Sequence, residues 1–240
     1  MDDGAHAEVR PRLGAANRLD AFVDAAFAFA VSLLIIAGGE PLRSYEDLLR
    51  ALMRIPAFLA GFALVVLFWL AHRAWSALGP KRDRTATLLS LAVVFSVLVF
   101  VFPLRLLTET AVHFMSGGLL PGGELITSFG QLGSIYVIYG LGFSILSVLY
   151  ALLFRHALTG MGAGDSHRVD ARSWMRTWIL AAAAGALSSV TAMSPLLPVA
   201  PWLPGVTYWL IPLGIWALAI VDRRTAAARN TAKEAGAAEV

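Results

Sequence analysis

Cysteine is absent from the 240-residue sequence, and charged residues make up only 15% of it. A chain without cysteine can form neither disulfides nor Cys-based zinc sites. Soluble domains are about 25% charged and about 45–50% apolar. This chain is 58% hydrophobic, and its mean hydropathy is +0.70. The composition therefore excludes most soluble enzymes and disulfide-rich scaffolds, and it favours an integral membrane protein.

Six apolar segments follow one another along the chain, each about long enough to cross about 30 Å of hydrocarbon as a helix. They are Leu19–Gly38, Ile55–Trp75, Thr85–Leu107, Phe129–Phe154, Trp174–Met193 and Leu203–Val221. We therefore expect an all-α integral membrane protein with six transmembrane helices over residues 18–224. Residues 1–17 are expected to form a mobile N-terminal arm and residues 225–240 a flexible C-terminal tail.

Basic residues alternate between the two sides of these six segments. Fifteen of the 19 fall on the side of the N terminus: Arg10, Arg12, Arg18, Arg73, Lys81, Arg82, Arg84, Arg155, Arg168, Arg172, Arg176, Arg223, Arg224, Arg229 and Lys233. The other side receives Arg43, Arg50, Arg54 and Arg105. The positive-inside rule then places both termini in the cytoplasm. The expected location is the plasma (inner) membrane of a bacterium, and the net charge of +3 does not indicate nucleic-acid binding.

Catalytic and metal-binding patterns are missing. The sequence has no GxSxG, phosphate-binding loop or CxxC. The five histidines lie far apart, without metal-ligand spacing: His6, His72, His113, His156 and His167. We expect no enzyme activity, no cofactor and no metal site.

The first apolar segment contains an ionisable residue well inside the predicted span. Asp24 lies six residues past Arg18, about 9 Å along a helix, and such groups mark function in membrane spans. Asp20 is nearer the interface, where water or the helix N terminus can stabilise it. Asp24 needs a partner from another helix, and Trp69 and His72 in the second segment can donate hydrogen bonds to a carboxylate. Arg18 is an alternative partner.

A helical wheel separates this segment into two sides. Phe22, Phe29, Leu33 and Ile36 fall on one stripe, which Ser32 flanks, and Asp24 falls on the other side. The stripe and Asp24 therefore cannot face the same space. Ordinary helix–helix packing would produce a stripe of this kind as well.

These residues resemble a known family. The pattern R-x-x-x-F-x-D at Arg18, Phe22 and Asp24 is similar to the R-x-x-x-F-S-D-G signature of transmembrane protein 175-like potassium channels, the bacterial relatives of a lysosomal channel. The run AFAFAVSLLII that follows, FWLAH at 68–72 and FPLRLL at 102–107 also resemble that family. Val23 stands where the family has Ser, and Ala25 where it has Gly. The resemblance covers about the first 107 residues.

The resemblance implies a homotetramer whose first helices line the pore, without a carbonyl filter loop. By position, Phe29, Leu33 and Ile36 would form the apolar constriction, with Ser32 as the pore hydroxyl. A structural lock behind the pore helix would consist of Arg18, Phe22, Asp24, Trp69 and His72. The permeant ion would be K⁺, and Phe29 stands where the family usually has Ile.

The leading hypothesis is a potassium-preferring cation channel, with a pore lined by the first helix and gated by the hydrophobic constriction. Self-association and membrane lipids are the expected contacts. A non-conducting membrane protein of the same fold, structural or partner-binding, is the alternative because the signature is degenerate. A secondary transporter is less favoured, because broken helices and repeated halves are not evident.

Overall fold

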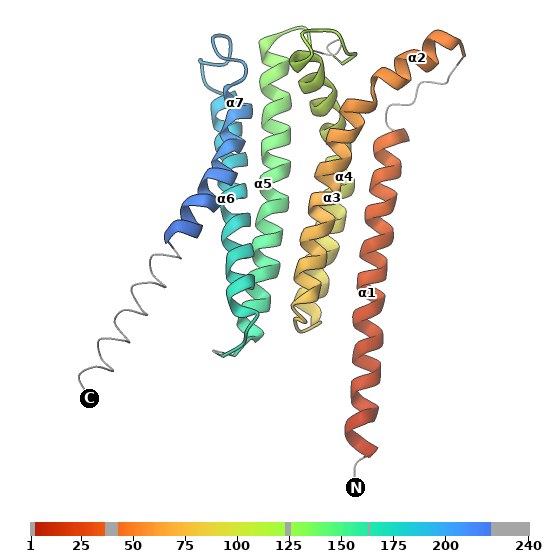
Figure 1. Ribbon diagram of the computed structural model, residues 1–240, viewed down its shortest axis with the longest axis vertical. Coiled ribbons are helices and arrows are strands. Elements are labelled where there is room, and N and C mark those ends of the chain that lie inside the picture. Colours follow the sequence, from red (N-terminus) through yellow and green to blue (C-terminus); the bar gives the residue numbers. More distant parts are fainter. Residues whose placement is uncertain (1–2, 37–42, 123–125, 163, 222–240) are drawn as a thin grey trace, which may run out of the picture.

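The computed structural model describes residues 3–36, 43–122, 126–162 and 164–221, and within these ranges it contains helices and no strand. Long helices run side by side along one direction (Figure 1). In chain order they are α1 (Asp3–Ile36), α2 (Tyr45–Met53), α3 (Ile55–Ala77), α4 (Arg84–Met115), α5 (Phe129–Gly160), α6 (Arg168–Ala192), α7 (Leu203–Val206) and η1 (Thr207–Trp209). The chain then continues as helix over 210–221.

Five of the described segments are long and apolar enough to cross a membrane: Arg18–Ile36, α3, α4, α5 and Leu203–Val221. The helix α6 lies where we expected the fifth span, but it is not among them. Its 25 residues begin with charged side chains and continue with many Ala, Gly and Ser. The fold is thus all-helical with several candidate spans, while the count of six stays a prediction.

Helix ends differ from the hydropathy boundaries. α1 begins at Asp3, so the backbone of 3–17, expected as an arm, is helical. α4 and α5 each run 32 residues, beyond the expected segments. Hydropathy marks the part of a helix that suits lipid, whereas capping groups set where the helix ends. The expected tail at 225–240 and the end of the first segment at Gly38 lie outside the described residues.

The helix α2 is a separate element that precedes α3. Ser44 caps it by accepting a hydrogen bond from the Asp47 N–H, and Asp47 accepts from the Ser44 N–H in return, which completes a capping box. The helix ends at Arg54, and Pro56 stands in the first turn of α3, where its missing N–H costs nothing. Figure 1 shows α2 angled away from the bundle, at the end opposite the N terminus.

Aromatic side chains join the central helices. Phe68 on α3 lies 5.8 to 6.1 Å, centroid to centroid, from Phe100 on α4, Phe143 and Tyr150 on α5, and Trp178 on α6. The Tyr150 hydroxyl donates a hydrogen bond to the Phe68 carbonyl. Aromatic pairs of this kind add stabilisation beyond their buried area. α3 to α6 therefore share one continuous core.

α1 packs on this core through one narrow face. Its buried residues, Val23, Phe27, Ala30 and Leu34, follow at steps of four, three and four, which keeps them on one side of a helix. Both α3 and α4 contact α1. At Gly61 on α3 the backbone comes close to Leu34, since an added Cβ would lie 3.1 Å from its Cδ2.

Candidate pore helix and its supporting contacts

The apolar stripe predicted on α1 lies outside the buried face. Phe29 is 55% exposed and Ile36 is 68% exposed. Ser32 is exposed, and Leu33 is partly buried against the core. The Ser32 hydroxyl donates to the Ala28 carbonyl, 3.2 Å away, within the helix. A single copy of the chain therefore leaves most of this stripe uncovered.

Asp24 occupies the other flank of α1, toward α3. The Trp69 indole Nε1 donates a hydrogen bond to Asp24 Oδ1 over 2.8 Å. The Arg73 guanidinium lies above the Trp69 ring, 4.9 Å from its centroid, which holds the indole from the other side. Among the described residues Asp24 makes no ion pair with Arg18, which is exposed. Of the two partners considered from sequence on the second segment, Trp69 makes the contact.

His72 lies about one helical turn after Trp69 on α3, and its side chain contacts a different helix. Its imidazole Nε2 lies 3.1 Å from the Ser90 hydroxyl on α4, and both residues are buried. The ring centroid is 5.1 Å from that of Trp75. His72 thus joins α3 to α4, and it does not hydrogen-bond Asp24. Phe22 is 52% exposed, so neither it nor Arg18 is packed behind α1 in one copy of the chain.

Asp20, which we expected to be stabilised by water or by the helix N terminus, is instead part of a polar cluster. Arg82, between α3 and α4, donates to Asp20 Oδ2 over 2.9 Å, and the Ser76 hydroxyl donates to the same oxygen over 2.8 Å. The Arg82 guanidinium lies 4.4 Å from the Trp75 ring centroid. Burial lowers the pKa of Arg82, and Asp20 opposes that shift. The cluster fixes the part of α1 around Asp20 to the α3–α4 connection.

The sequence contained a signal for this cluster. Asp20 and Arg82 have opposite charge and fall at the same end of neighbouring predicted segments. A second contact at this end joins His156 Nε2 on α5 to Asp83 Oδ2 over 3.0 Å. Asp83 also caps α4 by accepting from the Ala86 N–H. Its pKa is lowered, first by that backbone hydrogen bond and then by His156.

Fold and site together define a class: an all-helical, multi-pass membrane protein whose first helix keeps an apolar stripe uncovered. The sequence model of one family, described as the endosomal/lysosomal potassium channel TMEM175, matches residues 18–103. That region contains α1 from Arg18 onward, α2, α3 and the first part of α4. It also contains Asp20, Asp24, Trp69 and Arg82, the residues that hold α1.

Two relatives extend the match. A protein from Marivirga tractuosa named "Potassium channel" is 28% identical over 152 residues, which cover 59% of this chain and 59% of that protein. The chain thus spans about three fifths of this relative. A potassium channel from Chamaesiphon minutus is 24% identical over 172 residues, covering 67% of this chain and 77% of its own length.

Solved structures share the fold. A variant of the potassium channel MtTMEM175, in complex with a nanobody–MBP fusion protein, superposes with a TM-score of 0.70 at 23% identity. The match covers 86% of this chain and 93% of that one. A homologue of the lysosomal potassium-selective channel TMEM175, from Chamaesiphon minutus, gives a TM-score of 0.59 at 21% identity, and the match covers 82% of this chain and 95% of that one. Over residues 18–103 the chain is thus similar to the TMEM175 potassium channel family, and both relatives bear the names of potassium channels.

Proposed function

We propose that the chain is a potassium channel that works as a homotetramer, with a pore lined by α1. The names of its relatives support the permeant ion. The alternation of basic residues supports six crossings with both termini in the cytoplasm. One of the six is α6, which is not apolar enough to be among the five candidate spans. At 25 residues α6 is about 37 Å long, and it packs along α5. A helix covered by neighbours needs less apolar surface than one that faces lipid.

The exposed stripe on α1 is the observation that carries the proposal. One helix cannot enclose a path for ions, so a pore lined by α1 requires further copies. Phe29, Ser32 and Ile36 are exposed, although the same helix buries a different face against α3 and α4. Four copies arranged about an axis would bring these stripes together. The pore would then be narrowed by rings of Phe29, Leu33 and Ile36, with Ser32 offering a hydroxyl.

Apolar rings of this kind control the passage of ions by excluding or admitting water. A narrow apolar segment expels water, and an ion cannot enter without losing hydration. A modest widening lets water return and partly hydrated K⁺ follow. The contacts at Asp24 and Asp20 lie on the side of α1 that meets α3, so they hold the helix orientation without entering the pore. In this arrangement Trp69 holds α1 through Asp24, His72 joins α3 to α4 behind it, and Arg18 and Phe22 face a neighbouring copy.

The test is potassium flux from liposomes that contain the purified protein. Leu33→Ala removes bulk from the proposed constriction, and we expect it to raise flux severalfold above that of the unaltered chain. Ile35→Ala is the matched control, because Ile35 is a neighbouring exposed residue on the other flank of α1. It should leave flux unchanged.

Three outcomes separate the hypotheses. Flux only in Leu33→Ala would indicate an apolar gate that is closed under the conditions of the assay. Equal flux in all three proteins would remove Leu33 from the constriction. No flux from any of them, with folded and inserted protein, would favour the non-conducting membrane protein.

A further inference from the structure

The short helix α2 has two chemically different sides. Its large apolar residues recur at steps of three, one and three, which places them on one side of a helix. They are Tyr45, Leu48, Leu49 and Leu52. The charged residues lie on the other side, and they are Glu46, Asp47 and Arg50. The four apolar side chains are 41% to 72% exposed, so a single copy of the described chain leaves the apolar side of α2 uncovered.

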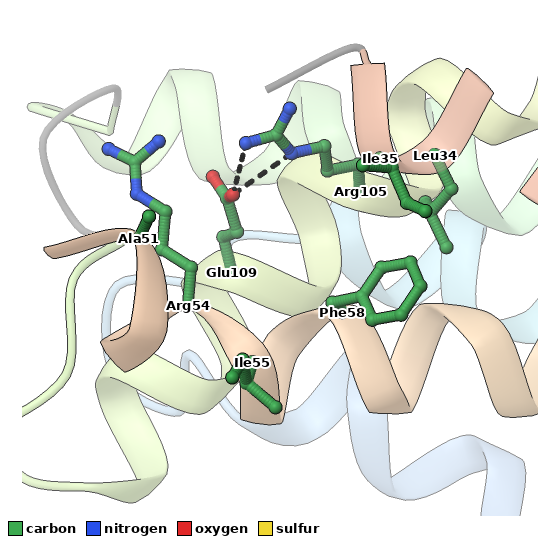
Figure 2. A pocket seen from close by; sticks show the side chains of 8 residues that line it. All are labelled: Leu34, Ile35, Ala51, Arg54, Ile55, Phe58, Arg105 and Glu109. Atoms are coloured by element: carbon green, nitrogen blue, oxygen red, sulfur yellow. Dashed lines mark hydrogen bonds and ion pairs between the residues drawn. The ribbon is translucent and has the colours of Figure 1, made fainter. Parts of the chain in front are cut away.

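The part of α2 that meets the bundle is not its apolar side. Ala51 lines a cavity of about 330 Å³ together with Arg105 and Glu109 of α4 (Figure 2). Arg105 donates through Nε and Nη2 to Glu109 Oε1 over 2.9 and 2.7 Å, so the wall opposite Ala51 is polar. Leu49 precedes Ala51 by two residues, a rotation of about 200° around the helix. The apolar side of α2 therefore points away from α4.

The apolar surface of α2 continues onto a candidate membrane span. α3 begins at Ile55, directly after the end of α2. Ile55, Leu59 and Phe62 are exposed, and their steps of four and three keep them on one side of α3. In a multi-pass membrane protein, an exposed apolar side of a span suits hydrocarbon. α2 turns away from the direction of the long helices at this end of the span (Figure 1), where hydrocarbon meets headgroups and water.

We propose that α2 binds the surface of the lipid bilayer, with its apolar side among the acyl chains and its charged side in water. Interfacial helices of this composition bury their apolar side about 5–10 Å into the boundary between headgroups and acyl chains. Arg50 Nη2 pairs with Asp47 Oδ1 over 2.7 Å, and Glu46 adds a second negative charge. The charged side of α2 thus has no excess of basic groups that would select anionic headgroups, and apolar burial carries the binding.

The depth of α2 can be measured without ion conduction, which keeps this proposal separate from the channel function. The chain has no cysteine, so a nitroxide spin label attaches only to an introduced one. Leu49→Cys and Leu52→Cys place the label on the apolar side, and Arg50→Cys is the matched control on the charged side. In phosphatidylcholine liposomes, collisions of the label with oxygen, which concentrates in hydrocarbon, and with a water-soluble nickel chelate report its depth.

The two sides of α2 should differ clearly. We expect labels at the two leucine positions to lie about 5–10 Å below the headgroup boundary, with an oxygen-to-nickel collision ratio severalfold above that of the Arg50→Cys label. Replacing part of the phosphatidylcholine with phosphatidylglycerol should leave these depths unchanged.

A second comparison measures the direction of α2 relative to the membrane. Tyr45 and Leu52 lie on the same side of the helix, seven residues apart. If α2 simply prolonged α3 across the bilayer, labels at Tyr45→Cys and Leu52→Cys would differ in depth by about 10 Å. A helix that lies on the bilayer surface should give less than half of that difference. The full difference would overturn the proposal in favour of a longer span.

Three further results would overturn it. Equal access of the nickel chelate to labels on both sides would place α2 in water. Labels on the apolar side that are shielded from oxygen and nickel alike would show that protein, such as a second copy of the chain, covers this side. Insertion that occurs only with phosphatidylglycerol would show recognition of headgroup charge in place of apolar burial.

Discussion

At the scale of single residues, Asp24 is stabilised by a neutral donor and not by a cation. The Trp69 indole contributes one N–H, at 2.8 Å, and its ring is in turn covered by Arg73. An indole is rigid and apolar over most of its surface. It can therefore hold a carboxylate at the flank of α1 without bringing a second charge into the same place. The contact sets the rotation of α1 about its own axis.

Removing the indole donor tests this contact. Trp69→Phe keeps an aromatic ring and loses the N–H, so we expect a lower Tm, by a few degrees, because hydrogen bonds to charged groups contribute about 1.5–3 kcal/mol. The ion preference should be unchanged. Trp209→Phe, at a residue that is 67% exposed, is the control and should leave Tm unaltered.

Asp24→Asn complements that variant. Asn retains an oxygen that can accept from Trp69 but carries no charge. We expect assembly or expression to suffer more than ion preference. An intact tetramer with altered selectivity would contradict the placement of Asp24 behind the pore.

At the scale of the helical elements, the start of α4 depends on Asp83. Its carboxylate caps the helix at the Ala86 N–H and reaches His156 on α5. These interactions favour the ionised form, which is why the pKa of Asp83 is lowered. A carboxyl group with a lowered pKa in the folded state stabilises fully above its unfolded pKa, about 3.9. That stabilisation is lost as the pH falls through the lower, folded value.

The pH dependence of Tm tests this cap. Asp83→Asn keeps a capping side chain and removes the charge. We therefore expect it to melt below the unaltered chain at pH 6, with the difference shrinking as the pH falls below about 4. Thermal unfolding between pH 3 and 7 would measure it, with Asp165→Asn, in the exposed loop before α6, as the control. A difference that is constant over this range would exclude the charge of Asp83 as its source.

Sequence patterns predicted some elements better than others. The segments that became α3, α4 and α5 were recognised because their apolar runs are long. α6 is long enough but rich in Ala and Ser, so it is missing from the candidate spans and its crossing stays a prediction. The contact from Trp69 to Asp24 was one of those anticipated from sequence, with His72 and Arg18 as the other partners considered. The partners of His72 and Asp20 could not be anticipated, because they depend on which way each helix is rotated in the bundle.

At the scale of the whole molecule, the number of copies decides whether a pore exists. The described chain has one core shared by α3 to α6 and a first helix attached by a single face. We expect native mass spectrometry in detergent to give a mass of four chains of 25.7 kDa. Ile36→Asp would place four like charges close together on the proposed axis, and it should shift the population toward monomers. A monomer that conducts potassium would contradict a pore shared between copies.

The close approach at Gly61 links the packing of α1 against α3 to the width of the proposed pore. A methyl group there would lie 3.1 Å from Leu34 Cδ2 and 3.6 Å from Thr108 Oγ1, so the Leu34 side chain would have to shift by a few tenths of an ångström. If α1 shifted with Leu34, opposite helices of the proposed ring of four would move by the same amount, and the distance between them across the axis would change by twice that step. In the proposed tetramer, the width of the pore would then depend on the absence of a side chain at Gly61, which lies outside the proposed pore lining.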